Sequence, residues 1–197
     1  MPSIITAGDA SNGLVVASGN DGAVVIQSGL AGAKVDAVVA AADGTLTFLR
    51  APIYSGSVLQ VISATITDKL STTSASYVDV TGLTVSITPS RSSNKILILG
   101  SVNYSVSSTT QNTFIRLVRN GLSIGNGADD ICFGGRMGTT AGVQTGSINY
   151  YDSPATTSTV VYKFQFKNYQ SSTSRINERG DTGNGYSSHI TVMEIAG

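Results

Sequence analysis

The sequence predicts an all-β protein, and three observations support that fold class. Short apolar runs recur along the chain and are separated by turns of Ser, Thr, Asn and Gly. After residue 57 about ten such runs follow one another, which is the spacing of a sandwich or barrel. The clearest run alternates apolar and polar side chains, as a half-buried antiparallel strand does. The single cysteine excludes an internal disulfide, so apolar burial must hold this fold together.

The first fifty residues are expected to form a thin β-rich attachment or stalk segment, residues 1–50. Turn pairs such as Asp21-Gly22 and Asp43-Gly44 suit tight hairpins. The Val-rich runs between the turns are expected to be strands, at 14–17, 24–27, 35–39 and 46–49. Strands this short cannot close a core within one chain, so they require neighbouring copies. The Ala-rich stretch 33–42 leaves a helix open as an alternative.

Residues 51–57 are expected to be a linker, because Pro52 cannot sit inside a strand ladder and small residues follow it. The second domain is then 58–197. Ten strands are expected in it, at 58–67, 77–88, 95–104, 113–119, 122–125, 131–133, 142–151, 159–167, 174–178 and 187–195.

Two features of these strands predict packing. In the strand at 159–167 four large side chains share one face and should enter the core: Val160, Tyr162, Phe164 and Phe166. In the strand at 77–88 the period of two breaks at Gly82, which predicts a bulge or corner there.

Two strands are apolar on both faces, at 96–99 and 190–195. This pattern is expected when one face packs in the core and the other against another subunit. Candidate residues of a subunit interface are therefore Ile96, Ile98, Ile190 and Val192. The alternative is that these are central strands of a monomer covered by loops.

Composition excludes several partners. Only 12% of residues are charged, with 12 basic and 12 acidic side chains, whereas 27 serines and 22 threonines supply much of the polarity. A bulk electrostatic hold on nucleic acid or on an acidic membrane is therefore not expected. The N-terminus lacks the pattern of a signal peptide, and no apolar run is long enough to insert into a bilayer, so a soluble product is expected.

The chain carries few groups suited to catalysis, and we expect neither enzymatic activity, nor a cofactor, nor a metal. Its one histidine, His189, lies in an apolar strand, and Cys132 lies between two apolar residues that should keep its thiol inert. No nucleophile elbow, phosphate loop or zinc-binding motif is present. The oxygen-rich turn at 178–185 leaves calcium binding open.

Loops rich in Tyr, Ser, Asn and Gly have the composition of recognition surfaces, although solvated turns share it. The candidate residues are Tyr169, Gln170, Asn177, Arg179, Asp181, Asn184 and Tyr186. Uncharged hydrogen-bonding groups favour a glycan or a protein over a nucleic acid.

The stretch from Tyr77 to Ser90, YVDVTGLTVSITPS, followed by NKILI at 94–98, carries a family resemblance. It resembles the C-terminal jelly-roll modules of tailed-bacteriophage fibres and capsid-decorating proteins. The hairpin at 116–121, RLVRNG, and the ending at 190–195, ITVMEI, are similar to the same pattern. The resemblance covers most of residues 58–197 and implies a jelly-roll sandwich in a homotrimer of the tumour necrosis factor type.

The resemblance also implies a function. The chain is expected to be a structural protein of a bacteriophage particle, a capsid-decorating or head-fibre protein at the virion surface, assembled in the host cytoplasm. Residues 1–50 would then attach to a capsid or tail protein. The alternative is a tail-fibre or tail-tip protein that recognises a host-surface glycan, and a second alternative is a secreted lectin-like trimer.

Overall fold

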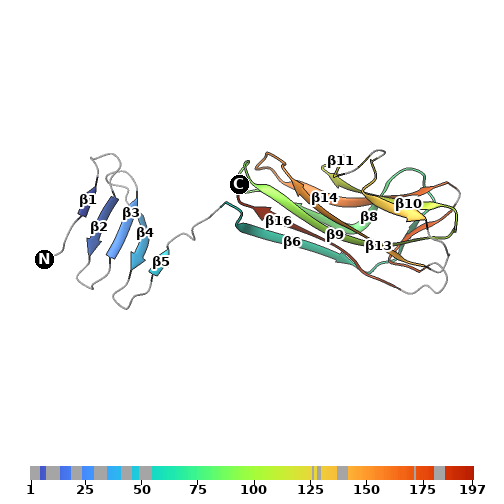
Figure 1. The fold of residues 1–197 in the computed structure, drawn as a ribbon, viewed down its shortest axis with the longest axis horizontal. Helices are drawn as coiled ribbons and strands as arrows, with labels where there is room; N and C mark the ends of the chain where they lie inside the picture. The colour runs from blue at the N-terminus through green and yellow to red at the C-terminus, as the bar shows by residue number, and fades with distance from the viewer. Residues whose placement is uncertain are drawn as a thin grey trace. The chain divides into compact units, whose positions relative to one another are not determined.

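The structure is a computed structural model. It describes five strands before residue 55 and then residues 55–197, except 126, 128–129, 137–141, 171 and 180–184. The chain divides into two compact units, Met1–Tyr54 and Ser55–Gly197, each shown in Figure 1. The described residues form strands and bridges and no α-helix, so the all-β fold class is confirmed. None of these residues forms a helix with the length and hydropathy that a membrane crossing requires.

The N-terminal unit is an antiparallel meander in which each strand pairs with the next along the chain. Its strands are β1 (Ile5–Ala7), β2 (Leu14–Ser18), β3 (Val24–Ser28), β4 (Val35–Ala40) and β5 (Leu46–Phe48). The helix considered for residues 33–42 is wrong, because β4 lies there and pairs with both β3 and β5. Branched valines suit a pleated strand better than a helix, and two partners satisfy the backbone of β4.

The second unit is a sandwich of two antiparallel sheets (Figure 1). The first sheet contains β6 (Val58–Ile66), β16 (Ser188–Ile195), β9 (Lys95–Val106), β15 (Ser174–Ile176) and β7 (Leu70–Thr72), with β13 (Gln144–Asp152) pairing with β9. The second sheet contains β11 (Leu122–Ile124), β10 (Asn112–Arg119), β14 (Val160–Tyr169) and β8 (Val78–Ile87), with β12 (Phe133–Arg136) pairing with β10.

The strands differ from the sequence prediction at two short elements. β7 was not expected, and its three residues are defined by pairing with β15. β12 starts at Phe133, where the expected strand at 131–133 ends, and it contains Gly134 and Gly135. A side chain at Gly134 would overlap the carbonyl oxygen of Thr113, so glycine allows β12 to approach β10 closely.

The core lies between the sheets and is centred on β14. Val160, Tyr162, Phe164 and Phe166 are at most 1% exposed, as the alternation in the sequence predicts. On the facing sheet, every second residue of β9 points into the same core. At Gly100 the series is interrupted, because a Cβ there would lie 2.5 Å from the Phe164 ring. The ring therefore fills the space that a side chain would otherwise occupy.

The irregularity predicted at Gly82 is confirmed. The register between β8 and β14 shifts across Lys163 and Gln165, opposite the part of β8 that contains Gly82. Gly82 has a φ of +86°, a conformation that strains any other residue. A Cβ there would also lie 2.8 Å from Ile66. The shift lets Val80 and Leu83 both face the core, although they are an odd number of residues apart.

A buried carboxylate organises one end of the first sheet. Glu194, on β16, is 1% exposed. Its Oε1 accepts hydrogen bonds from the Ser90 backbone N–H at 2.6 Å, the Ser90 hydroxyl at 2.8 Å and the Asn94 amide at 2.6 Å. Its Oε2 accepts one from the Gln60 amide at 2.6 Å. Four donors compensate the loss of hydration of this charge.

At this end of the first sheet, the first residues of the sandwich unit are hydrogen-bonded to its last strand. The Gly56 N–H donates to the Ala196 carbonyl at 2.8 Å, and the Ala196 N–H donates to the Ser57 carbonyl at 2.9 Å. The start of β6 is thus fixed to the end of β16 by backbone hydrogen bonds as well as by the link between Gln60 and Glu194.

A second buried carboxylate connects the two sheets. Asp152, at the end of β13, accepts a hydrogen bond from the Tyr162 hydroxyl at 2.6 Å. The Arg119 guanidinium contacts both carboxylate oxygens of Asp152, at 2.8 and 2.9 Å. Burial, together with the neighbouring carboxylate, raises the pKa of Tyr162, which keeps its hydroxyl protonated as the donor.

The Glu194→Gln variant is expected to unfold about 2 to 3 kcal/mol more easily in urea at pH 7, because an amide cannot accept from all four donors. The matched control is Glu178→Gln, since Glu178 is partly exposed and contacts Arg175 at 3.5 Å. The control should cost less than about 1 kcal/mol. Equal costs for the two variants would contradict the role of Glu194.

Acid should destabilise the protein partly through Glu194. Burial raises the pKa of this carboxyl, but the hydrogen bonds from Asn94, Gln60 and Ser90 outweigh it and lower the pKa below its ordinary value of 4.5. The stabilisation is therefore complete above pH 4.5 and is lost as the pH falls through the lower folded pKa. Urea unfolding from pH 7 to pH 3 should show a weaker acid dependence in Glu194→Gln than in the wild type, and identical slopes would refute this.

Candidate binding surfaces

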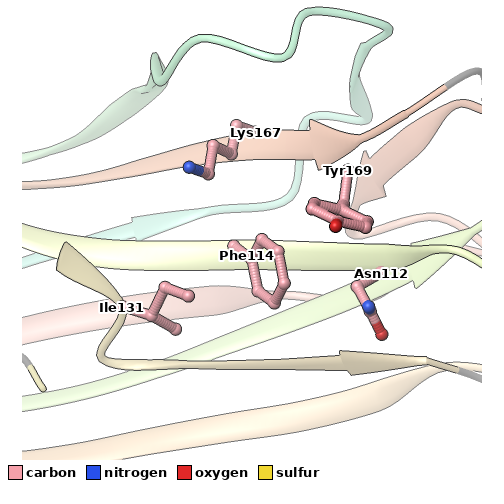
Figure 2. Close-up of a pocket in the computed structure, with 5 residues that line it drawn as sticks. All are labelled: Asn112, Phe114, Ile131, Lys167 and Tyr169. Carbon is pink, nitrogen blue, oxygen red and sulfur yellow. The ribbon is translucent and has the colours of Figure 1, made fainter. Parts of the chain in front are cut away.

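The outer face of the second sheet contains an open depression of about 560 Å³. It is lined by side chains from β10, from β14 and from the segment before β12, which Figure 2 shows: Asn112, Phe114, Ile131, Lys167 and Tyr169. The register of β10 and β14 brings them together, because Phe114 lies opposite Lys167 and Asn112 opposite Tyr169. We call these five residues the aromatic pocket.

The aromatic pocket has an apolar floor and a cationic side. The Phe114 and Tyr169 rings meet edge to face, with centroids 5.7 Å apart. The Lys167 ammonium lies 4.5 Å from the centroid of the Tyr77 ring and 5.8 Å from that of Phe114. Tyr169 is 48% exposed, so its ring is open to a ligand. Such a mixture of aromatic surface and few polar groups is typical of small-molecule sites.

Two other cations on this face, Arg116 and Lys163, are paired with carboxylates. Arg116 stacks over the Tyr77 ring at 4.1 Å and contacts the Asp130 carboxylate at 3.3 Å. Lys163 contacts Asp79 at 2.7 Å. Burial raises the pKa of Asp79, but the hydrogen bonds from Lys163 and Gln165 outweigh this effect, so the pKa lies below its ordinary value.

A second surface is the outer face of the first sheet. Val61, Met193, Leu97 and Tyr151 are successive neighbours on β6, β16, β9 and β13, and they form one row across four strands. Val61 is 54% and Tyr151 55% exposed. We define the apolar outer face as this row together with the outward-facing Val58, Leu99 and Ile195.

The four residues proposed for a subunit interface lie on the wrong side of their strands for that role. Ile96, Ile98, Ile190 and Val192 are each 0% exposed within one chain. They pack between the sheets, where a second copy cannot reach them. The correction follows from strand geometry, because the residues between them on β9 and β16 face outward. Of the outward-facing residues on these two strands, Leu97, Leu99, Met193 and Ile195 belong to the apolar outer face.

The predicted recognition loops are brought together only in part. Tyr169 lines the aromatic pocket, and Gln170 follows it, exposed and with a φ of +65°. Tyr186 is 37% exposed, and its N–H donates to the Asn177 carbonyl at 3.0 Å. Arg179 is partly exposed. Asp181 and Asn184 lie outside the described residues, as does most of the turn considered for calcium.

Asn177 is not a surface residue, so its assignment to a recognition loop is wrong. It is 0% exposed and has a φ of +56°. Its amide donates to the carbonyls of Ile66 at 3.0 Å and Asp68 at 3.3 Å, and it accepts from the Ser188 hydroxyl at 2.6 Å. A buried amide that satisfies backbone groups positions a turn rather than a ligand.

Sequence reasoning missed four of the five pocket residues, Asn112, Phe114, Ile131 and Lys167. One feature of the sequence could have indicated Lys167: it falls on the polar, outward-facing side of the alternating strand. Phe114 also faces outward, on β10, but nothing in the sequence indicates that β10 and β14 are neighbours.

The isolated reactive side chains do not converge. His189 is exposed on the first sheet, beside Ser101 and Thr65. The Cys132 sulfur accepts from the Leu117 N–H at 3.1 Å. Within the described parts of the chain, no group of three or more His, Cys, Asp or Glu side chains could hold a metal ion.

The fold and these surfaces define a two-sheet β-sandwich with one aromatic pocket and one apolar sheet face. No protein-family model and no curated protein matches the chain. Among solved structures it is similar to infectious bursal disease virus, Gt strain, at 13% identity and a TM-score of 0.41, covering 90% of this chain and 48% of that one.

Two further solved structures are similar to the chain. The insecticidal delta-endotoxin Cry8Ea1 from Bacillus thuringiensis is 11% identical with a TM-score of 0.37, covering 98% of this chain and 41% of the toxin. Infectious bursal disease virus, Gx strain, is 14% identical with a TM-score of 0.36, covering 96% and 55%. The chain thus spans about half the length of the solved chains that it matches.

The Cys132 thiol should react slowly with alkylating reagents. Burial raises its pKa above the ordinary value of 9.0, although the hydrogen bond from Leu117 acts in the opposite direction. Alkylation by iodoacetamide at pH 8 should be about tenfold slower than that of glutathione, because less thiolate is present. Unfolding in urea should remove the difference. A rate equal to that of glutathione in the native protein would instead indicate an activated thiol.

Proposed function

We propose that this chain is a non-enzymatic structural protein of a tailed-bacteriophage particle. In this proposal it is a trimeric capsid-decorating or head-fibre protein, assembled in the host cytoplasm and located at the virion surface. Residues 1–50 attach to a capsid or tail protein, and the sandwich projects outward. The apolar outer face carries the proposal, and the sequence resemblance supplies its setting.

The apolar outer face supports association with further copies. Three of its members, Val58, Val61 and Tyr151, are more than half exposed, and they adjoin partly exposed Leu97 and Met193. Contiguous apolar patches of this kind on a protein surface mark interaction sites. Full burial of an exposed side chain of this kind contributes about 1.5 to 3 kcal/mol, so each half-exposed member contributes about half of that to a complex. The number three comes from the resemblance.

The N-terminal unit supports the role of an attachment segment. Its described strands form one sheet of five, none longer than six residues. A sheet must bury at least one face against another layer. A capsid or tail protein, or the same segment of other copies, would supply that layer.

The described ionisable groups support a role without catalysis. Glu194 and Asp152 are consumed by structural hydrogen bonds, and Asp79 is paired with Lys163. Burial raises the pKa of Cys132, which disfavours the nucleophilic thiolate. His189 lies on an open sheet face beside two hydroxyl residues, without a carboxylate as cross-strand partner.

The aromatic pocket favours the second candidate function, a tail-fibre or tail-tip protein that recognises a host-surface glycan. Its open rings and polar edge are suited to a ligand, whereas a purely decorating protein does not require them. The two functions differ in where the protein sits on the particle and share the trimer.

The wild-type protein is expected to sediment at three times the 20.2 kDa mass of one chain. Leu97→Glu should weaken the trimer at least tenfold while leaving a cooperative thermal transition, because the side chain faces outward. The matched control Val161→Glu, on the outer face of the second sheet, should leave the trimer intact. Ile98→Asp should instead prevent folding. A wild-type monomer at micromolar concentration, or a trimer unaffected by Leu97→Glu, would exclude this interface.

The location on the particle separates the two functions. Phage particles would be labelled with gold-conjugated antibodies against residues 55–197 and imaged by electron microscopy. A uniform coat over the head supports decoration, and a cluster at the tail supports receptor binding. Particles without label would contradict both.

A further inference from the structure

Lys167 differs from Arg116 and Lys163, two other cations on the outer face of the second sheet. Arg116 and Lys163 each contact a carboxylate, at 3.3 and 2.7 Å. Lys167 contacts the Tyr77 and Phe114 rings, and no carboxylate of the described residues lies within ion-pair distance of its ammonium. The aromatic pocket therefore carries one positive charge that a ligand can neutralise.

The remaining surface of the pocket selects the shape of such a ligand. The exposed Tyr169 ring offers an apolar face against which the C–H face of a pyranose ring can pack. The Asn112 amide offers both a donor and an acceptor for sugar hydroxyls. A volume of about 560 Å³ suits one or two sugar rings.

The same observations disfavour two other classes of ligand. A nucleic acid strand is held by several cations acting together, and the pocket has one that is not paired. A peptide usually adds along an open strand edge through backbone hydrogen bonds. The pocket lies on the face of β10 and β14, where the backbone groups are already used in the ladder between these strands.

We propose that the aromatic pocket binds an acidic glycan, with a carboxylate of a uronic or sialic acid unit paired to Lys167. The sugar ring packs against Tyr169 and Phe114, and Asn112 hydrogen-bonds its hydroxyls. This site is on the opposite sheet from the apolar outer face, so it goes beyond the proposed trimer and does not depend on it.

The test starts with the full-length protein on an array of sialate-bearing, uronate-bearing and neutral glycans. The strongest acidic glycan is then titrated by calorimetry beside its carboxyl methyl ester, which removes only the charge. We expect binding of the acid and at least tenfold weaker binding of the ester. Absence of binding to every acidic glycan, or equal affinity for acid and ester, would overturn the proposal.

Three variants locate the site. Lys167→Gln should weaken binding of the acid about tenfold and abolish the preference over the ester, since a charged hydrogen bond is lost. Tyr169→Ala should weaken both ligands. The matched control Lys163→Gln, on the same strand and face, should change neither. Unchanged affinity in Lys167→Gln would place binding elsewhere, and tighter binding of a poly-glutamate peptide than of any glycan would identify a peptide site instead.

The same titration with Leu97→Glu separates this proposal from the trimer. Calorimetry reports affinity per chain, so the acidic glycan should bind the dissociated variant as it binds the wild type. If Leu97→Glu loses the trimer but still binds the acidic glycan, both the trimer interface and the glycan site are supported. If the protein assembles but binds no acidic glycan, only the glycan site is contradicted.

Discussion

The contact between the Phe164 ring and the backbone at Gly100 sets how the two sheets meet. A ring on β14 occupies the place of a side chain on β9, and no larger residue fits there. With this contact fixed, the parity of both strands is fixed as well, because neighbouring residues point to opposite faces. The strands that build the core with one set of alternate side chains point the other set outward, and these outward side chains form most of the aromatic pocket and the apolar outer face.

Local period predicts much of this fold and little of its surfaces. The alternation in β14 and the break in the alternation of β8 at Gly82 are visible in the sequence because in each case a single strand contains the whole pattern. In β9 and β16 both faces are apolar, so the sequence offers no reason to send Ile98 inward and Leu97 outward. That choice depends on which sheet lies opposite, and only the assembled sandwich decides it.

The surfaces were harder to predict because they arise from pairing between distant segments. Phe114 and Lys167 are neighbours only through the register of β10 with β14. Asn177 is of a residue type common in recognition loops, but its amide donates hydrogen bonds to the backbone carbonyls of Ile66 and Asp68. Residue type therefore indicated polarity correctly, whereas exposure depended on which backbone groups needed partners.

The pairing of Gly56 and Ser57 with Ala196 has a mechanical consequence. Tension that reaches the sandwich through the preceding chain acts first on these backbone hydrogen bonds and on the nearby link from Gln60 to Glu194. Behind them β6 remains paired with β16 along its length. The last strand of the sandwich, β16, thus holds its first strand, β6, in place, and resistance to pulling at this point is complete only after β16 has folded onto β6.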